Sequence, residues 1–140
     1  MKSGPALRQL TAHRTIHNAA QGQAVALTER LKEQFNKGEK TDSYELAEQL
    51  ITLWEEKIIA HADAKDHDLY EELLQKGNVS NKELYMLMRD HDLFRKIVAH
   101  AKEILAKNNY VDERHVSIFD ALLIINHFHH IGEEETLFPS

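Results

Sequence analysis

The feature that most constrains this chain is the spacing of its apolar residues, which recur in alternating steps of three and four along four long stretches. This spacing predicts amphipathic α-helices, because it places side chains on one face of a helix with 3.6 residues per turn. Helix breakers are scarce, with prolines only at Pro5 and Pro139. Four long helices joined by short loops favour an all-α fold, an antiparallel up-down-up-down four-helix bundle.

Capping and breaker residues set the expected boundaries of these helices. Asp42 with Glu45, and Ser80 with Glu83, have the spacing of a helix N-cap and its partner three residues later. Glycine, asparagine and proline fall where the periodic stretches stop. The expected helices span, in turn, about Ser3–Asn36, Asp42–Lys76, Ser80–Asn109 and Asp112–Phe138.

Length and composition narrow the class of protein. A chain of 140 residues fits one domain, residues 1–140, that buries a full core without outside support. The formal net charge of -6 argues against a nucleic-acid-binding surface. No apolar run approaches the ~20 residues that span a bilayer, and the N-terminus lacks the layout of a signal peptide. We therefore expect a cytoplasmic protein with neither a membrane nor a nucleic acid as partner.

The sequence contains no cysteine and ten histidines. Without thiols, any metal must be held by nitrogen and oxygen ligands. The histidines are not gathered in a terminal tag, so their positions on the helices decide what they can do.

Each predicted helix has polar residues within its apolar stripe. These are His13 and His17 in the first helix, His61 and Lys65 in the second, His91 in the third, and His129 and Glu133 in the fourth. At about 1.5 Å of rise per residue, they lie at similar heights, about 15 Å from the bundle end that carries the termini. An unpartnered buried imidazole or carboxylate costs about 1–3 kcal/mol or more, and shared coordination of a metal removes that cost.

The other histidines have a simpler interpretation. His67, His100, His127 and His130 fall outside the stripes and are expected at the solvated surface. His115 lies near a helix start, where the pattern does not decide between surface and core.

Four segments resemble the motifs of hemerythrin-like (HHE cation-binding) domains over essentially the whole chain. The segment from His129 through Glu133 and Glu134 to Leu137-Phe138-Pro139 resembles the H-x-x-x-E-E…L-F-P motif. The segments around His13, around His61 and Lys65-Asp66, and around His91 resemble the motifs of the first three helices. Family members often continue past the L-F-P motif, so the sequence is also compatible with a piece of a longer protein.

The resemblance implies a four-helix bundle with a non-haem diiron centre, or another metal, that binds or senses oxygen or nitric oxide or handles peroxide. The implied ligands are His13, His61, His91, His129 and Glu133. Ferritin-like diiron bundles fit less well, because they use Glu-x-x-His pairs and this sequence has none.

The sequence departs from the family pattern at Lys65, where a bridging glutamate is expected. A lysine facing two metal ions would be repelled by them, so it must deprotonate or turn aside, or only one metal binds. His17 and Asp68 are placed to supply a compensating ligand, and we include His17 in the predicted ligand set. A hydrogen-bonded His17 that only supports a ligand is the alternative.

Three functions remain open on sequence grounds. The first is a non-haem iron protein that binds a small diatomic or peroxide ligand in a pocket lined by Trp54, Ile58, Leu69, Phe94 and Ile125. The second is a haem-binding bundle with His17 and either His61 or His91 as axial ligands, and with Ala20 and Ala24 making room for the macrocycle. The third is a bundle with a single structural or sensory metal, or none, and a protein partner that the sequence does not identify. Any chemistry would belong to the metal, since no separate catalytic base or nucleophile stands out.

Overall fold

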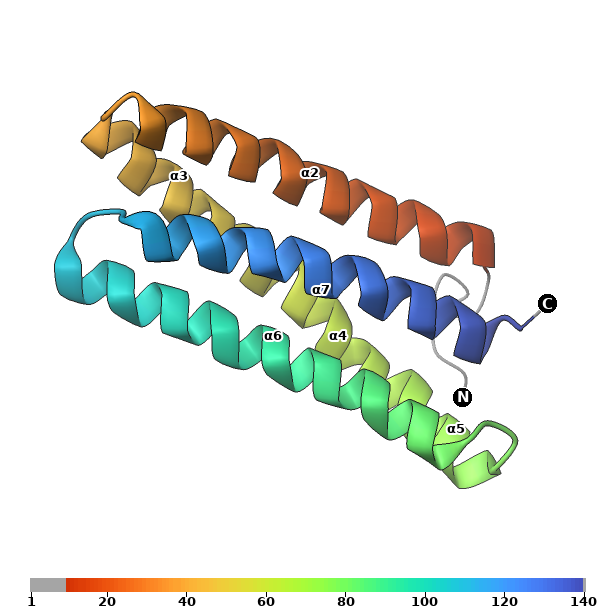
Figure 1. Cartoon of the computed structure of the whole chain (residues 1–140). Coiled ribbons are helices and arrows are strands. Elements are labelled where there is room, and N and C mark those ends of the chain that lie inside the picture. The colour runs from red at the N-terminus through yellow and green to blue at the C-terminus, as the bar shows by residue number, and fades with distance from the viewer. Residues whose placement is uncertain (1–9, 140) are drawn as a thin grey trace.

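The structure is a computed structural model, and it describes residues 10–139. This part of the chain is all-helical and contains no strand. Four long helical stretches lie side by side (Figure 1). They are α2 (Leu10–Asn36), the continuous run from Lys40 to Lys76, α6 (Asn81–Asn108) and α7 (Glu113–Leu137). The all-α class expected from the periodicity is confirmed.

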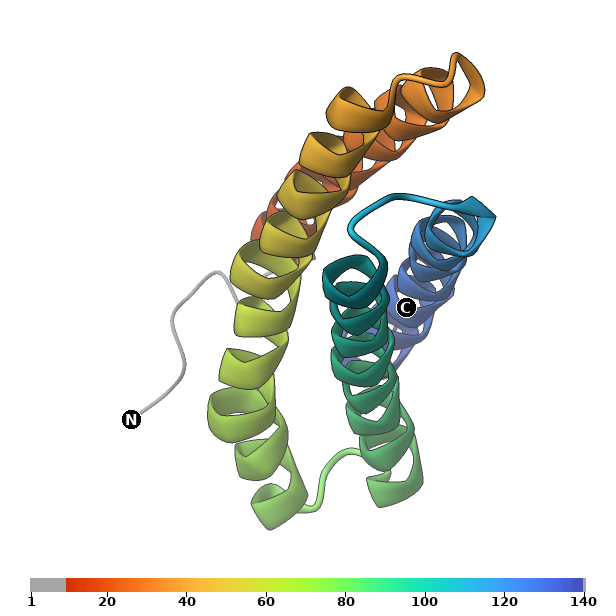
Figure 2. The same cartoon turned by 90° about the vertical axis from the view of Figure 1, so that its left-hand side faces the viewer.

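The second stretch is one helix whose internal hydrogen bonding changes along its length. It comprises α3 (Lys40–Leu53), η1 (Trp54–Ile59), α4 (Ala60–Ala64), η2 (Lys65–Tyr70) and α5 (Glu71–Lys76), where η1 and η2 are π-helical. Figure 2 shows these segments as one uninterrupted rod. The backbone angles at the junctions stay helical, so the hydrogen bonding changes from α-helical to π-helical without a break in the helix.

The helix ends mostly follow the sequence signals. Ser80 caps α6 by accepting from the Glu83 amide, and Asp112 caps α7 by accepting from the Arg114 amide. The cap expected at Asp42 is wrong, because the second helix already begins at Lys40 and its N-cap residue is Glu39. The expected start at Ser3, with Pro5 in the first turn, lies outside the described residues. At the C-terminal end α7 stops at Leu137, just before Pro139.

Two residue types end helices in the left-handed conformation. Gly77 follows α5 with φ 71°, and Asn109 follows α6 with φ 59°. Glycine has no Cβ to clash there, and asparagine tolerates the conformation better than most residues. The turns after α2 and α6 lie at one end of the molecule, and the turn after α5 lies at the other (Figure 1).

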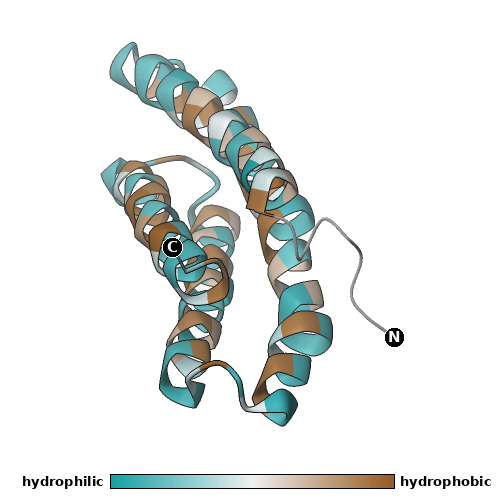
Figure 3. Ribbon diagram, turned by 90° about the vertical axis from the view of Figure 1, so that its right-hand side faces the viewer, coloured by the Kyte–Doolittle hydropathy of each residue, from teal (hydrophilic) through white to brown (hydrophobic). Residues whose placement is uncertain are grey.

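The core has two parts, and polar residues lie between them along the helices. The larger cluster is built on Trp54, Phe94 and Phe119, and the smaller on Leu69, Tyr70 and Leu84. Figure 3 shows hydrophobic and hydrophilic residues alternating around the helices, as expected for elements that bury one face. The candidate site occupies the level between the two clusters.

Candidate metal centre

A layer of polar side chains lies inside the helical bundle. Its members are contributed by every long helix and are at most 4% exposed: His13, Lys65, His91, His129 and Glu133. Buried charged and imidazole groups are rare unless they are paired. The convergence inferred from the four stripes is therefore present in the structure, with Lys65 among the buried groups.

Glu133 is the hub of one side of this layer. Its Oε1 atom accepts from Lys65 Nζ at 2.8 Å and from His13 Nε2 at 2.5 Å, and its Oε2 atom accepts from the Tyr70 hydroxyl. Burial acts to raise the Glu133 pKa, but the Lys65 charge and the hydrogen bonds from His13 and Lys65 outweigh it, so the pKa is lowered. Glu133 is thus a buried, ionised carboxylate in which both oxygens accept hydrogen bonds.

The π-helical segment η2 explains how one turn of the second helix makes two contacts with Glu133. Lys65 opens η2 and Tyr70 closes it, five residues later. A π-helix bonds residues five apart, so positions i and i+5 come close to the same face. Lys65 and Tyr70 can therefore approach the two oxygens of a single carboxylate.

His91 and His129 form the other side of the layer. Each ring donates from Nδ1 to a carboxylate at 2.8 Å, His91 to Asp66 and His129 to Asp90. Their Nε2 atoms face each other at 3.1 Å. With the protons on Nδ1, both Nε2 atoms present lone pairs, which repel unless a proton or a metal ion lies between them.

An arginine reinforces the support of His91. Arg95 contacts both Asp63 and Asp66 at 2.6 Å. Burial acts to raise the Asp66 pKa, but hydrogen bonds from His91 and Arg95 lower it overall. Asp66 therefore stays ionised and accepts the Nδ1 proton of His91. Carboxylate partners of this kind are typical of metal-binding histidines, because they fix the tautomer and aim the free nitrogen.

Several of the imidazoles are held in their neutral form. Burial lowers the pKa of His129 to about 4. The hydrogen bond to Asp90 acts to raise it, whereas His91 and Lys65 lower it further. Burial and the Lys65 charge likewise lower the pKa of His17 and of His61 to about 4. A neutral imidazole is the form that binds a metal.

Within residues 10–139, two groups of three residues could hold an ion, and they share Glu133. One group is His13, His130 and Glu133, and the other is His91, His129 and Glu133, with ligand atoms within 4.8 Å of one another in each. The predicted surface position of His130 is wrong. Its side chain is 12% exposed, and its Nδ1 atom, like that of His13, is buried with no hydrogen-bond partner in the described residues.

Two predicted ligands, His17 and His61, lie beside these groups but belong to neither of them. Both line the same cavity as His91 and His129. The His17 ring lies against the His130 ring, with centroids 3.1 Å apart. Their role as ligands stays a prediction. Asp68, the other candidate to compensate for Lys65, is exposed.

The cavity between the histidines is small, at about 30 Å³. Of its predicted lining, Ile58 and Phe94 are present, whereas Trp54, Leu69 and Ile125 are not. The buried stripe of α7 explains the last difference, because it runs through Phe119, Leu122, Asn126, His129 and Glu133. Asn126 takes the place expected for Ile125 and donates to Gln21 of α2 at 2.7 Å.

Outside the layer, the remaining histidines divide as follows. His67, His100 and His127 are exposed, as expected. His115, which the pattern left open, is fully buried, and its Nδ1 atom accepts from the Asp112 amide in a capping box.

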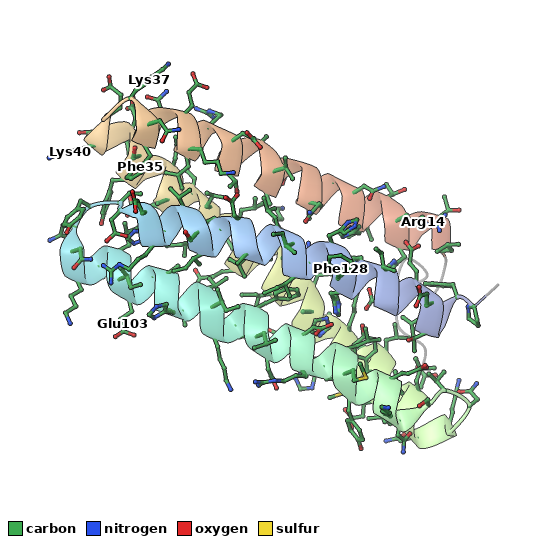
Figure 4. The ribbon with its side chains drawn as sticks, in the orientation of Figure 1. Arg14, Phe35, Lys37, Lys40, Glu103 and Phe128 are labelled. Carbon is green, nitrogen blue, oxygen red and sulfur yellow. The ribbon has the colours of Figure 1, made fainter. Side chains whose placement is uncertain are left out.

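An ion pair of Arg14 with Glu134 links α2 to α7 at the edge of the layer, and Figure 4 places Arg14 near the C-terminal end of α7.

Comparison with known proteins establishes no family for this chain. No family model matches the sequence, and no solved structure matches the fold. Among curated proteins, the mitochondrial iron-sulfur clusters transporter ATM1 of Candida glabrata is 34% identical over 87 residues. That match covers 60% of this chain and 12% of the transporter's length.

Within residues 10–139, none of the helices has the length and apolar character needed to cross a membrane.

Proposed function

We propose that the chain binds a transition metal, iron in the first place, in a non-haem centre formed by the buried polar layer. In this proposal the protein binds, senses or detoxifies a small oxidant such as oxygen, nitric oxide or peroxide. The observation that carries the proposal is the pair His91 and His129, whose Nε2 atoms face each other at 3.1 Å while both Nδ1 atoms are committed to carboxylates. Such a pair is ready to bind a cation.

The residues of the layer fit the donor set that such a metal prefers. Imidazole and carboxylate together suit iron, manganese or zinc. His13, His91, His129 and Glu133 are the candidate ligands of the layer, with His61 and His17 at the cavity and His130 as an addition from the structure. When bound, iron would supply the redox chemistry and an open position for the oxidant. The protein's share is to hold neutral imidazoles in place and to exclude bulk water from them.

The cavity favours a small ligand and a non-haem centre. About 30 Å³ is room for a water molecule or a ligand of similar size. A haem bound by His17 and a histidine opposite would need far more space, and Ala24, expected to make room for it, is fully buried in the apolar core. The haem alternative therefore has no support from the packing around these residues.

The resemblance to hemerythrin-like domains supports the same proposal through fold and order of motifs. In Figure 1 the turns after α2 and α6 lie at one end of the molecule and the turn after α5 lies at the other. This alternation supports an antiparallel up-down-up-down bundle, which is the fold that the resemblance implies. We extend the proposal to that topology, and a cytoplasmic location stays a prediction.

Elemental analysis with an ultraviolet-visible spectrum tests this function on protein purified under air without added metal or a histidine tag. Iron in stoichiometric amount, with absorption in the near ultraviolet, is the expected result. Addition of nitric oxide to the anaerobic, reduced protein should then change the spectrum. A Soret band would replace the proposal with haem binding. Protein that takes up no iron even after reconstitution would contradict it.

A further inference from the structure

We infer that the Lys65 ammonium group takes the place of one of two cations, so that the centre binds a single metal ion, at His91, His129 and Glu133. This inference rests on the proposed function, because it concerns the number of ions that the same layer holds. It goes beyond the resemblance, which implies a pair of metal ions and a glutamate where this chain has lysine.

The contacts of Lys65 place its charge among the ligands of the first group. Lys65 is 2% exposed, and its Nζ atom lies 2.8 Å from Glu133 Oε1 and 3.3 Å from His13 Nε2. Glu133 and His13 belong, with His130, to the first three-residue group, and His130 Nδ1 lies 3.7 Å from the same Glu133 oxygen. The ammonium group has not turned aside, and it uses the donors that a metal ion would need.

A metal ion in the first group would be held close to this ammonium group. An ion bound to Glu133 Oε1 at about 2.1 Å could lie no farther than about 5 Å from Lys65 Nζ, given the 2.8 Å hydrogen bond. At that distance, inside a buried layer, a divalent ion and an ammonium group repel each other with little screening. The first group is therefore closed to an ion while Lys65 is charged and in place.

Charge balance points the same way. Glu133 is the only carboxylate shared by both groups, and Lys65 already neutralises it through a buried ion pair. The carboxylates of Asp66 and Asp90 lie behind His91 and His129, on the side of the second group. In that group the Nδ1 atoms of both histidines are bonded to these carboxylates, and the two Nε2 atoms face each other and are free to bind an ion. One ion can bind there without removing Lys65.

Metal stoichiometry tests the inference, with Zn²⁺ and Co²⁺ as the probes, in equilibrium dialysis followed by elemental analysis. The wild type should bind one ion per chain, and Lys65→Glu should bind two. Lys65→Met, which removes the charge without adding a ligand, should also admit a second ion, but more weakly. Lys40→Glu is the matched control, because Lys40 is an exposed residue at the start of the same helical stretch, lies outside the lining of the cavity, and undergoes the same change of charge. It should stay at one ion.

The possible outcomes separate this inference from the proposed function. Two ions in the wild type, or one ion in both Lys65 variants, would overturn the inference and leave metal binding intact. No ion in the wild type or in any variant would overturn the proposed function itself. If Lys65→Glu does not fold, as judged by its circular dichroism, the stoichiometry of Lys65→Met decides.

Discussion

His91 and His129 lie on neighbouring helices with their Nε2 atoms 3.1 Å apart, and each turns its Nδ1 atom away toward a carboxylate. The lone pairs of the two Nε2 atoms repel each other unless a proton or a cation lies between them. In the proposed function, the arrangement of this pair, more than the number of histidines, accounts for the affinity of the layer for a metal.

Removing one member of this pair should abolish most of the metal binding. We expect His129→Ala to lower metal content at least tenfold, since even supporting partners of metal ligands are typically worth about 10- to 100-fold in affinity. Glu133→Ala should do the same. His100→Ala is the control, because His100 is exposed and outside the layer, and it should match the wild type in elemental analysis. Equal losses in all three variants would count against the layer.

The carboxylate behind His129 should matter although it does not face the metal. Asp90→Asn removes the charge that orients His129, and we expect metal affinity to fall about 10- to 100-fold with the fold retained. Asp92→Asn is the matched control, because Asp92 is a nearby exposed carboxylate that pairs with Arg95 and does not contact His129 in the described residues. Titration with Co²⁺ gives both affinities. Similar affinities for the two variants would mean that Asp90 does not position His129.

His115 should make stability depend on pH through the start of α7. Burial, partly opposed by Asp112, lowers the pKa of His115 from 6.5 in the folded protein. The unfolded chain therefore binds the proton more readily, and stability falls as the pH drops from about 6.5 toward the lowered pKa. One such group contributes at most about 1.4 kcal/mol per pH unit in that interval.

The variant His115→Gln isolates this contribution, because glutamine can complete a capping box but does not titrate. Urea unfolding of the metal-free proteins at pH 7 and pH 5 measures the free energy of unfolding. We expect the wild type to lose more of it than the variant over this range. An identical loss in both proteins would assign the pH dependence to other groups.

Phe94 should be a main support of the layer from the apolar side. It is 1% exposed, packs against Trp54, and makes a T-shaped contact with the His129 ring. Phe94→Ala should cost about 3–5 kcal/mol in the free energy of unfolding, as large core truncations do. Phe128→Ala removes the same ring from a residue that is 65% exposed on α7 (Figure 4), and it should change stability by less than about 0.5 kcal/mol. Comparable costs for the two would show that the core does not depend on Phe94.

Periodicity alone located much of the layer. His13, His91, His129 and Glu133 continue the three-and-four spacing of apolar neighbours, and the structure buries all of them. Along α7, however, Ile125, which the sequence predicts in the lining of the pocket, is only partly buried, and its neighbour Asn126 is buried. A buried asparagine breaks an apolar pattern, and only its partner Gln21 on another helix makes it acceptable there.

Other features depend on tertiary context that no single helix contains. His130 is next to a stripe residue, and its side chain is only 12% exposed, with the His17 ring of α2 lying against it. The contact of Lys65 with Glu133 joins residues 68 positions apart. The π-helical turns of the second helix have no signature in the spacing of apolar residues, which is why a plain helix was expected there.

The widened turn of η2 carries a consequence for how sequences of this kind are aligned. Lys65 and Tyr70 both contact Glu133 only because five residues separate them within a π-helical turn. A chain with one residue fewer in this segment would keep every side chain of the layer and still turn Tyr70 away from the carboxylate. A one-residue gap between these two positions is therefore a change in the centre itself, and an alignment that treats it as neutral loop variation would hide that change.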